Sequence, residues 1–149
     1  MFNGKGYAMS VEENKAKVLR AFELVNWGIV DALRELMTPT FVGRDPTGTF
    51  DRDKYVALMA ARLRAVPDAH FSIDGIVAEG DKVAVRYSYT GTVNPALWGN
   101  PGAVEEARQT RIDVFRVADG KIQEGWAEAD LPRIAPELGF GNATGLKAG

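Results

Sequence analysis

The feature of this sequence that most constrains its fold is a change in the spacing of apolar residues near Pro67. Before this point apolar side chains recur every three or four residues, as in Val18, Phe22 and Val25, which is the spacing of one face of a helix. After it they alternate with polar residues, as over 83–89, which is typical of a half-buried strand. Helices followed by antiparallel strands predict an α+β fold with the helices covering one face of the sheet.

Three helices are expected before Pro67. Ser10 and Glu13 form an S-x-x-E capping box, which predicts a helix start, and this helix ends near Trp27. A second, short helix is expected over 29–37, where apolar residues keep the helical spacing. A third is expected over 51–66, whose first residue is an aspartate that can cap it.

Turn signals divide the remaining chain into strands and loops. Asp119-Gly120 is a tight-turn sequence that predicts a hairpin joining 111–117 to 121–129. The segments 43–48 and 94–108 are rich in glycine and proline and are expected to be loops. Loops as long as the second one are often functional.

The length of 149 residues fits one domain. We assign that domain to residues 10–139, with a flexible leader over 1–9 and a flexible tail over 140–149. A strongly twisted sheet closed on one side by helices leaves a conical hollow, and where the layers do not meet this hollow becomes a pocket.

Composition excludes several classes of function. The net charge is -2 and Lys and Arg form no basic stripe, which argues against a nucleic-acid partner. The chain has no cysteine, so disulfides and thiolate sites are excluded. No apolar run reaches the roughly 20 residues of a membrane span, and the N-terminus lacks the apolar segment of an export signal. We therefore expect a cytoplasmic protein without membrane contact.

Three stretches carry a resemblance to a known family: Val66-Pro67-Asp68, the nine residues AEGDKVAVR over 78–86, and the twelve residues FRVADGKIQEGW over 115–126. Together with Glu137-Leu138-Gly139 they make residues 11–139 resemble polyketide cyclases of the SnoaL type, within the nuclear transport factor 2-like superfamily. The resemblance implies a cone-shaped fold, with N-terminal helices packed on a curved antiparallel sheet. The superfamily includes aldol cyclases, ketosteroid isomerases and limonene-epoxide hydrolases. The resemblance therefore also implies a cofactor-independent enzyme of the cyclase or isomerase type, which would be classed as a lyase or an isomerase.

The resemblance also implies an acidic residue shortly after the tryptophan of the last strand. Glu128 and Asp130 stand two and four positions past Trp126, so a regular strand would place them on one face. Glu128 is the carboxylate expected to move a proton inside an apolar cone, and its alternative is a glutamate that faces solvent. Asp130 precedes Leu131-Pro132, and for it a capping role is favoured over catalysis.

Arg86 lies between apolar residues of a strand, where its permanent charge needs water or a carboxylate. We expect it to pair with Glu128, either to orient that carboxylate or as a structural bridge. Limonene-epoxide hydrolases are similar in having an Arg-x-Asp pair on a strand, but the matching positions here are Arg86 and Ser88. The missing aspartate argues against that chemistry.

A second Arg-x-Asp pair occurs at Arg111 and Asp113, which share one side of their strand. For this pair we favour a solvated or dimer-facing position. The single histidine, His70, alternates with Phe71 and shares a face with Ser72 and Asp74, so an exposed row is expected. One histidine without a carboxylate cluster predicts no metal site.

The expected ligand is a small hydrophobic molecule, polyketide-like or terpenoid-like, that carries a carbonyl group. Its pocket would be lined by large aromatic and apolar side chains. About half of the candidate residues are expected to contact the pocket, and the others to pack in the hydrophobic core. The candidates are Trp27, Phe41, Tyr55, Met59, Tyr87, Tyr89, Trp98 and Trp126. Tyr89 could also hydrogen-bond the substrate oxygen, but its strand parity is opposite to that of Arg86. The alternatives to an enzyme are a ligand-binding or assembly protein, and the sheet is expected to form a homodimer.

Overall fold

The computed structural model of the chain describes residues 10–92 and 106–129. The elements are α1 (Val11–Asn26), a 3-10 turn η1 (Val30–Ala32), α2 (Leu33–Leu36), β1 (Met37–Asp45), β2 (Gly48–Asp51), α3 (Arg52–Ala65), β3 (His70–Glu79), β4 (Lys82–Thr92), β5 (Glu106–Ala118) and β6 (Lys121–Ala129). Among the helices of these residues, none has the length and apolar character that crossing a bilayer requires.

The observed caps confirm the helix starts predicted at Ser10 and at Asp51. The Ser10 hydroxyl accepts the N–H of Glu13 at 3.1 Å, and the Glu13 carboxylate accepts the N–H of Ser10 at 2.9 Å. The carboxylate of Asp51 accepts the N–H of Lys54 at 2.8 Å and starts α3. These side chains satisfy N–H groups that have no partner inside a helix.

The six strands form one sheet in the order β2-β1-β6-β5-β4-β3. All neighbours are antiparallel except β1 and β6, which are parallel, so the sheet is mixed and not antiparallel throughout as predicted. The loop expected over 43–48 is also wrong in part, because β1 runs to Asp45 and pairs with β2. Strand β2 has only four residues, too few to show the alternating pattern of a strand. The strands β1 and β6 are far apart in the sequence, so local patterns do not reveal that they pair.

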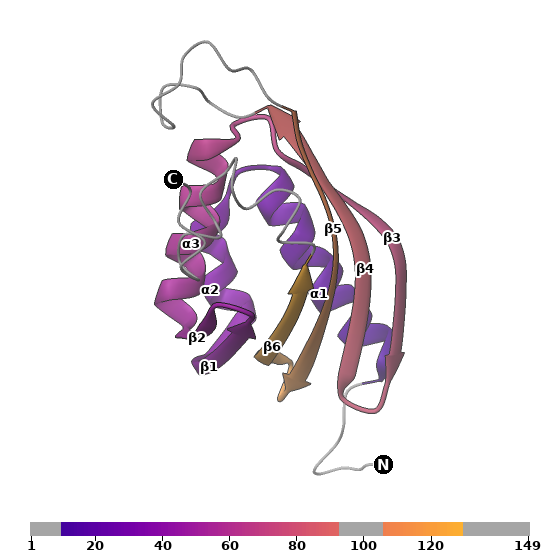
Figure 1. Ribbon diagram of the computed structural model, residues 1–149. Helices are drawn as coiled ribbons and strands as arrows, with labels where there is room; N and C mark the ends of the chain where they lie inside the picture. The colour runs from indigo at the N-terminus through magenta and orange to yellow at the C-terminus, as the bar shows by residue number, and fades with distance from the viewer. Residues whose placement is uncertain (1–9, 93–105, 130–149) are drawn as a thin grey trace.

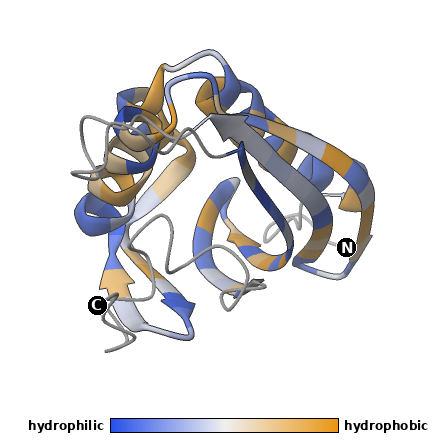
Figure 2. Cartoon of the chain, turned by 45° about the horizontal axis from the view of Figure 1, so that its top comes forward, coloured by the Kyte–Doolittle hydropathy of each residue, from blue (hydrophilic) through white to orange (hydrophobic). Residues whose placement is uncertain are grey.

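The sheet curves around the helices (Figure 1). The long strands β3, β4 and β5 bend together on one side, while α1 packs on β3 and β4 and α3 packs on β1 and β2. Hydrophobic and hydrophilic residues alternate as bands along these strands (Figure 2), which is the pattern of a sheet with one covered face. The α+β cone expected from the sequence is therefore the fold observed.

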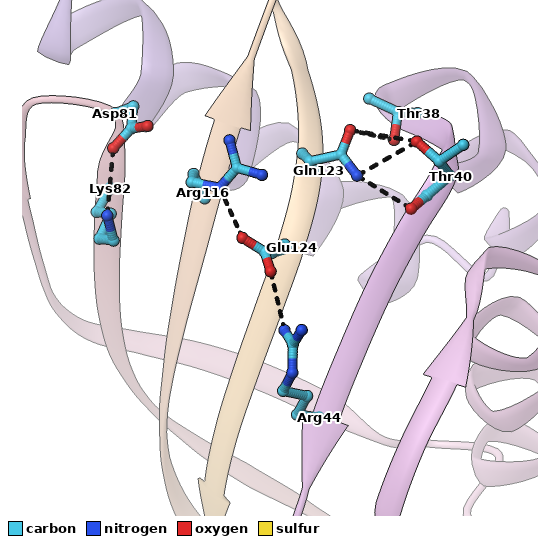
Figure 3. Close-up of polar contacts among 8 residues, drawn as sticks. All are labelled: Thr38, Thr40, Arg44, Asp81, Lys82, Arg116, Gln123 and Glu124. Carbon is cyan, nitrogen blue, oxygen red and sulfur yellow. Dashed lines mark hydrogen bonds and ion pairs between the residues drawn. The ribbon is translucent and has the colours of Figure 1, made fainter.

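Polar side chains on the outer face fasten the parallel joint between β1 and β6 (Figure 3). Glu124 of β6 accepts hydrogen bonds from Arg116 of β5 at 2.7 Å and Arg44 of β1 at 3.0 Å. These arginines, Arg116 first, hold the pKa of Glu124 below its ordinary value. The amide of Gln123 reaches across to β1, where Thr38 donates to its oxygen at 2.9 Å. Three strands are thus tied together outside the core.

The edge strand β3 is held by a side chain of α1. The Asn26 amide donates to the carbonyl of Phe71 at 2.9 Å and accepts the N–H of Phe71 at 2.8 Å. The side chain therefore takes the place of a neighbouring strand at this edge. The ring of Phe71 is buried and contacts Tyr89 with 4.8 Å between ring centroids, so this bond positions part of the aromatic core.

We predict that Asn26→Ala lowers the free energy of unfolding by about 1–3 kcal/mol, because both backbone groups of Phe71 lose their partner. Urea unfolding followed by circular dichroism measures this change. Glu23→Ala on the same helix is the control, since it removes only an exposed ion pair with Arg20 and should cost at most about 1 kcal/mol. Equal effects of the two changes would contradict the role given to Asn26.

Candidate active site

A cavity lies between the helices and the inner face of the sheet. Its walls are mainly apolar, with α3 and β1 on one side and α1, β4 and β5 on the other; among the lining residues are Leu33, Met37, Phe41, Met59, Phe71 and Phe115. The volume of this cavity is about 60 Å³, measured as the space that the centre of a water molecule can occupy. One water needs roughly 10–15 Å³ by this measure, so the cavity has room for a ligand group.

One end of this cavity is polar. Arg111 and Asp113 of β5 point inward and are buried, with 9 % and 6 % exposure, and Tyr87 of β4 lies directly opposite Arg111 in the register. The Tyr87 hydroxyl donates to Oδ2 of Asp113 at 2.9 Å. An Arg111 nitrogen lies 3.6 Å from Oδ1 of Asp113, which is an ion pair too long for a strong hydrogen bond. We call Asp113, Arg111 and Tyr87 the polar triad.

Asp113 is the buried acid of the site. Burial raises its pKa above the ordinary aspartate value, because the ionised form loses its hydration. Arg111 and the hydrogen bond from Tyr87 act against this rise without cancelling it. Among the described residues, none donates a hydrogen bond to Oδ1, so this oxygen is held by the ion pair alone and remains able to take a proton.

Two arginines face this acid. Burial opposes the charged form of Arg111, but Tyr87 and Asp113 outweigh it, so its pKa lies above the ordinary value. Burial lowers the pKa of Arg62 of α3, and the charge of Arg111 lowers it further. Arginine pKa values are high enough that both guanidinium groups remain charged at neutral pH.

The tyrosines around the cavity stay protonated. Burial raises the pKa of Tyr55 and of Tyr89 to about 12, and it raises that of Tyr87 well above its usual range. They act near neutral pH as neutral hydroxyl groups that can donate hydrogen bonds. Within the described ranges, no group of three His, Asp or Glu side chains is placed to hold a metal ion.

The structure does not bring together the residues predicted to be catalytic. Glu128 is exposed and lies opposite Ile112 on the outer face, so its predicted inward orientation is wrong. Arg86 is also on the outer face, where it pairs with Asp74 at 3.4 Å and not with Glu128. Arg86 and Tyr89 could face the same side only if a bulge interrupted β4 between them. The irregularity in this pair of strands lies instead on β3, between Ile73 and Gly75, so Tyr89 faces inward and Arg86 outward. Asp130 lies outside the described residues.

The predicted binding residues divide into three groups. Phe41, Tyr55, Met59, Tyr87 and Trp126 are among the residues lining the cavity. Tyr89 is fully buried but lies beyond the lining, and Trp27 is 60 % exposed. Trp98 lies outside the described residues. His70, Ser72 and Asp74 are exposed, which confirms the predicted exposed row.

The solvated or dimer-facing position predicted for Arg111 and Asp113 is wrong, because β5 reverses the usual pattern. Its apolar residues Ile112 and Val114 face outward, while the charged Arg111 and Asp113 share the inner face with Phe115. Placing the apolar residues inside therefore put the charged pair outside. The available signal was the Arg-x-Asp spacing itself, which is incomplete at Arg86 and complete at Arg111.

Several solved structures resemble this chain in fold. AclR from Streptomyces galilaeus, a provisionally assigned hydroxylase, is 25% identical over 88% of this chain and 98% of its own, with a TM-score of 0.77. IdmH from Streptomyces antibioticus, a provisionally assigned polyketide cyclase, is 26% identical over 85% and 98%, with a TM-score of 0.75. A nuclear transport factor 2-like protein from Cytophaga hutchinsonii shares the fold at 14% identity, over 80% of this chain and 92% of its own, with a TM-score of 0.61.

Among proteins with curated descriptions, none matches this sequence. The family model for SnoaL-like polyketide cyclases matches residues 16–138, which is most of the chain. This match agrees with the curved sheet, the helices on its inner face and the cavity between them. The chain belongs to the SnoaL-like polyketide cyclase family.

Proposed function

We propose that this chain is a cofactor-independent enzyme in which Asp113 moves a proton on a small, largely apolar carbonyl compound. The observation that carries the proposal is a buried carboxylate with a raised pKa at the polar end of an apolar cavity. A pKa raised from the ordinary aspartate value moves toward the range in which a side chain can both take and return a proton near neutrality. Membership of the cyclase family supports the same class of reaction.

In the proposed reaction Oδ1 of Asp113 takes a proton from the carbon next to the substrate carbonyl. Tyr87 holds Oδ2 at 2.9 Å and so fixes the plane of the carboxylate. The electron pair left on carbon delocalises onto the carbonyl oxygen, and the negative oxygen can accept hydrogen bonds from Arg111. The low-dielectric wall strengthens this interaction.

Two outcomes of this carbanion fit the site. In an aldol ring closure the carbon attacks a second carbonyl of the same molecule, a carbon–carbon bond forms, and the new alkoxide takes the proton back from Asp113. In an isomerisation the proton returns to a different carbon. Both routes leave Asp113 as it began and need no oxidant or reductant. The apolar wall suits a polyketide-like or terpenoid-like substrate.

An epoxide is a second candidate substrate, because Arg111 and Asp113 supply the Arg-x-Asp spacing of limonene-epoxide hydrolases. In that case a protonated Asp113 would give its proton to the epoxide oxygen as that C–O bond breaks, the oxygen of a water would bond to the ring carbon, and the proton that this water loses would return to Asp113. Formation of a diol from limonene oxide would favour this candidate over the carbonyl reaction.

The proposed proton transfer is testable without the natural substrate. In D2O the wild-type protein should speed deuterium exchange at the methyl group of 2-acetonaphthone, an aromatic methyl ketone that serves as the probe. Asp113→Asn should reduce this acceleration about 100-fold or more, because the variant side chain cannot take a proton. Proton NMR follows the loss of the methyl signal.

Glu128→Gln is the matched control, since it neutralises an exposed carboxylate on the outer face and should leave the exchange rate unchanged. Exchange that is equally accelerated by Asp113→Asn would remove Asp113 from the mechanism. A wild-type protein that does not accelerate exchange at all would instead favour the ligand-binding alternative, in which the same cavity holds a molecule without converting it.

The raised pKa of Asp113 also predicts a pH dependence of stability. Between the ordinary aspartate pKa and its raised value, the folded state binds more protons than the unfolded state. The contribution of Asp113 to the free energy of unfolding therefore falls as pH rises through this window, by about 1.4 kcal/mol for each unit of increase in pKa. Urea unfolding at several pH values measures this decline.

Asp113→Asn should lack that decline, so the stability of the wild type relative to the variant should fall as pH rises. Asp81→Asn removes a negative charge at an exposed turn and controls for the change in net charge. A wild-type advantage that grows with pH would instead mean that Arg111 and Tyr87 lower the pKa of Asp113.

We also propose that two copies associate through the outer face of the sheet. Val77 and Ile112 on this face are 68 % and 50 % exposed, which suits a symmetric apolar contact. Ile112→Asp should shift the mass in solution toward one chain, because it places a charge within the contact. Light scattering measures the mass, and a wild-type chain that is monomeric at all concentrations would contradict the proposal.

A further inference from the structure

Two arginines and one carboxylate are among the residues that line the inner part of the cavity. Arg62 and Arg111 both line it, and Asp113 is the acid that faces them. The other charged lining residues, Arg44 and Asp45 of β1, contact Glu124 and Thr47. Arg62 is likewise not without a partner, and only Arg111 is therefore considered as the binding group.

The buried hydrogen-bonding groups beside the triad are mainly donors without acceptors. Arg111 donates to Oε1 of Gln109 at 3.4 Å, but within the described part of the chain its Nε has no acceptor. The same holds for the side-chain nitrogen of Gln109 and the hydroxyl of Tyr89, which occupy paired positions of β5 and β4 and are not among the residues lining the cavity. Both residues are almost fully buried, with exposures of 1 % and 0 %.

Leaving buried donors without acceptors costs free energy, and the cost is larger for a charged group. A guanidinium carries five N–H donors in a fixed planar arrangement, and a carboxylate offers two oxygens that match it. The apolar wall next to Arg111 provides a surface for the rest of the same ligand. The site therefore combines a cation, one of whose N–H donors has no acceptor among the described residues, with an adjoining hydrophobic wall.

We infer that the ligand of this cavity is an apolar molecule bearing a group that is already anionic at neutral pH, such as a carboxylate, and that Arg111 binds this group through its Nε, while its terminal nitrogens serve the substrate carbonyl oxygen. This inference rests on the proposed function for its site, and it adds the chemical class of the substrate. Gln109 is a positioning residue in this scheme, because it holds one nitrogen of Arg111 through its side-chain oxygen. Asp113 competes with the ligand for the same guanidinium.

The test compares two probes of the same shape, 2-naphthoate and the uncharged 2-naphthamide, by calorimetric titration of the full chain. The naphthoate should bind about tenfold more tightly, since charge-assisted hydrogen bonds are roughly twice as strong as neutral ones. Arg111→Gln should bring this ratio close to one while leaving naphthamide binding nearly unchanged. Arg86→Gln removes an exposed arginine on the outer face and should keep the wild-type ratio.

Asp113→Asn keeps the test decisive if Arg111→Gln fails to fold. This variant frees Arg111 from its competing carboxylate, so naphthoate should bind more tightly than to the wild type. Equal affinity for the two probes, absence of naphthoate binding, a ratio unchanged in Arg111→Gln, or naphthoate binding that is not tightened by Asp113→Asn would each overturn the inference. Failure of the proton-transfer proposal would appear instead as ketone exchange that survives Asp113→Asn.

Discussion

The site depends on one arrangement, a carboxylate buried beside a guanidinium and a phenol in an apolar interior. Removing a charge from water is costly, so Asp113 must be either paired or protonated. The pairing it receives is incomplete, because Arg111 lies 3.6 Å from one oxygen and only Tyr87 makes a short hydrogen bond to the other. Burial therefore outweighs the stabilising contacts, and the pKa of Asp113 is raised.

The fold supplies this arrangement through the sheet. Strand β5 is central, with β4 and β6 on either side, so its inward side chains lie beneath the helices and its register with β4 places Tyr87 opposite Arg111. The strand β1 closes the other wall of the cavity, and it joins the sheet through the parallel contact with β6. The outer-face contacts of Glu124 and Gln123 hold that joint (Figure 3), so residues outside the cavity help to determine its width.

Much of the fold could be predicted from local chemistry. The capping residues Ser10 and Asp51 act within a few positions, and the alternation over 83–89 is a property of one strand, so both are visible in the sequence. The parallel pairing of β1 with β6 is not, because it joins segments about 80 residues apart that have no shared pattern. Such a pairing is decided by how the whole sheet packs.

The candidate site was harder to predict for a related reason. The rule that apolar residues face inward fails on β5, where Ile112 is exposed and Asp113 is buried. A site of the kind proposed needs polar groups in the interior, and such sites are where the usual pattern of apolar residues is expected to be broken. Glu128 faces solvent, as most charged residues do. The prediction that it points into the cavity used only its distance in sequence from Trp126, and that distance does not determine which face it occupies.

The central claim is that Asp113 has its proton affinity raised by burial, and NMR titration of its labelled side-chain carboxyl carbon tests this most directly. We expect a midpoint above the ordinary aspartate value of about 3.9. In Tyr87→Phe the midpoint should move higher still, because the phenol that stabilises the ionised form is gone. A midpoint at or below the ordinary value in the wild type would contradict the account.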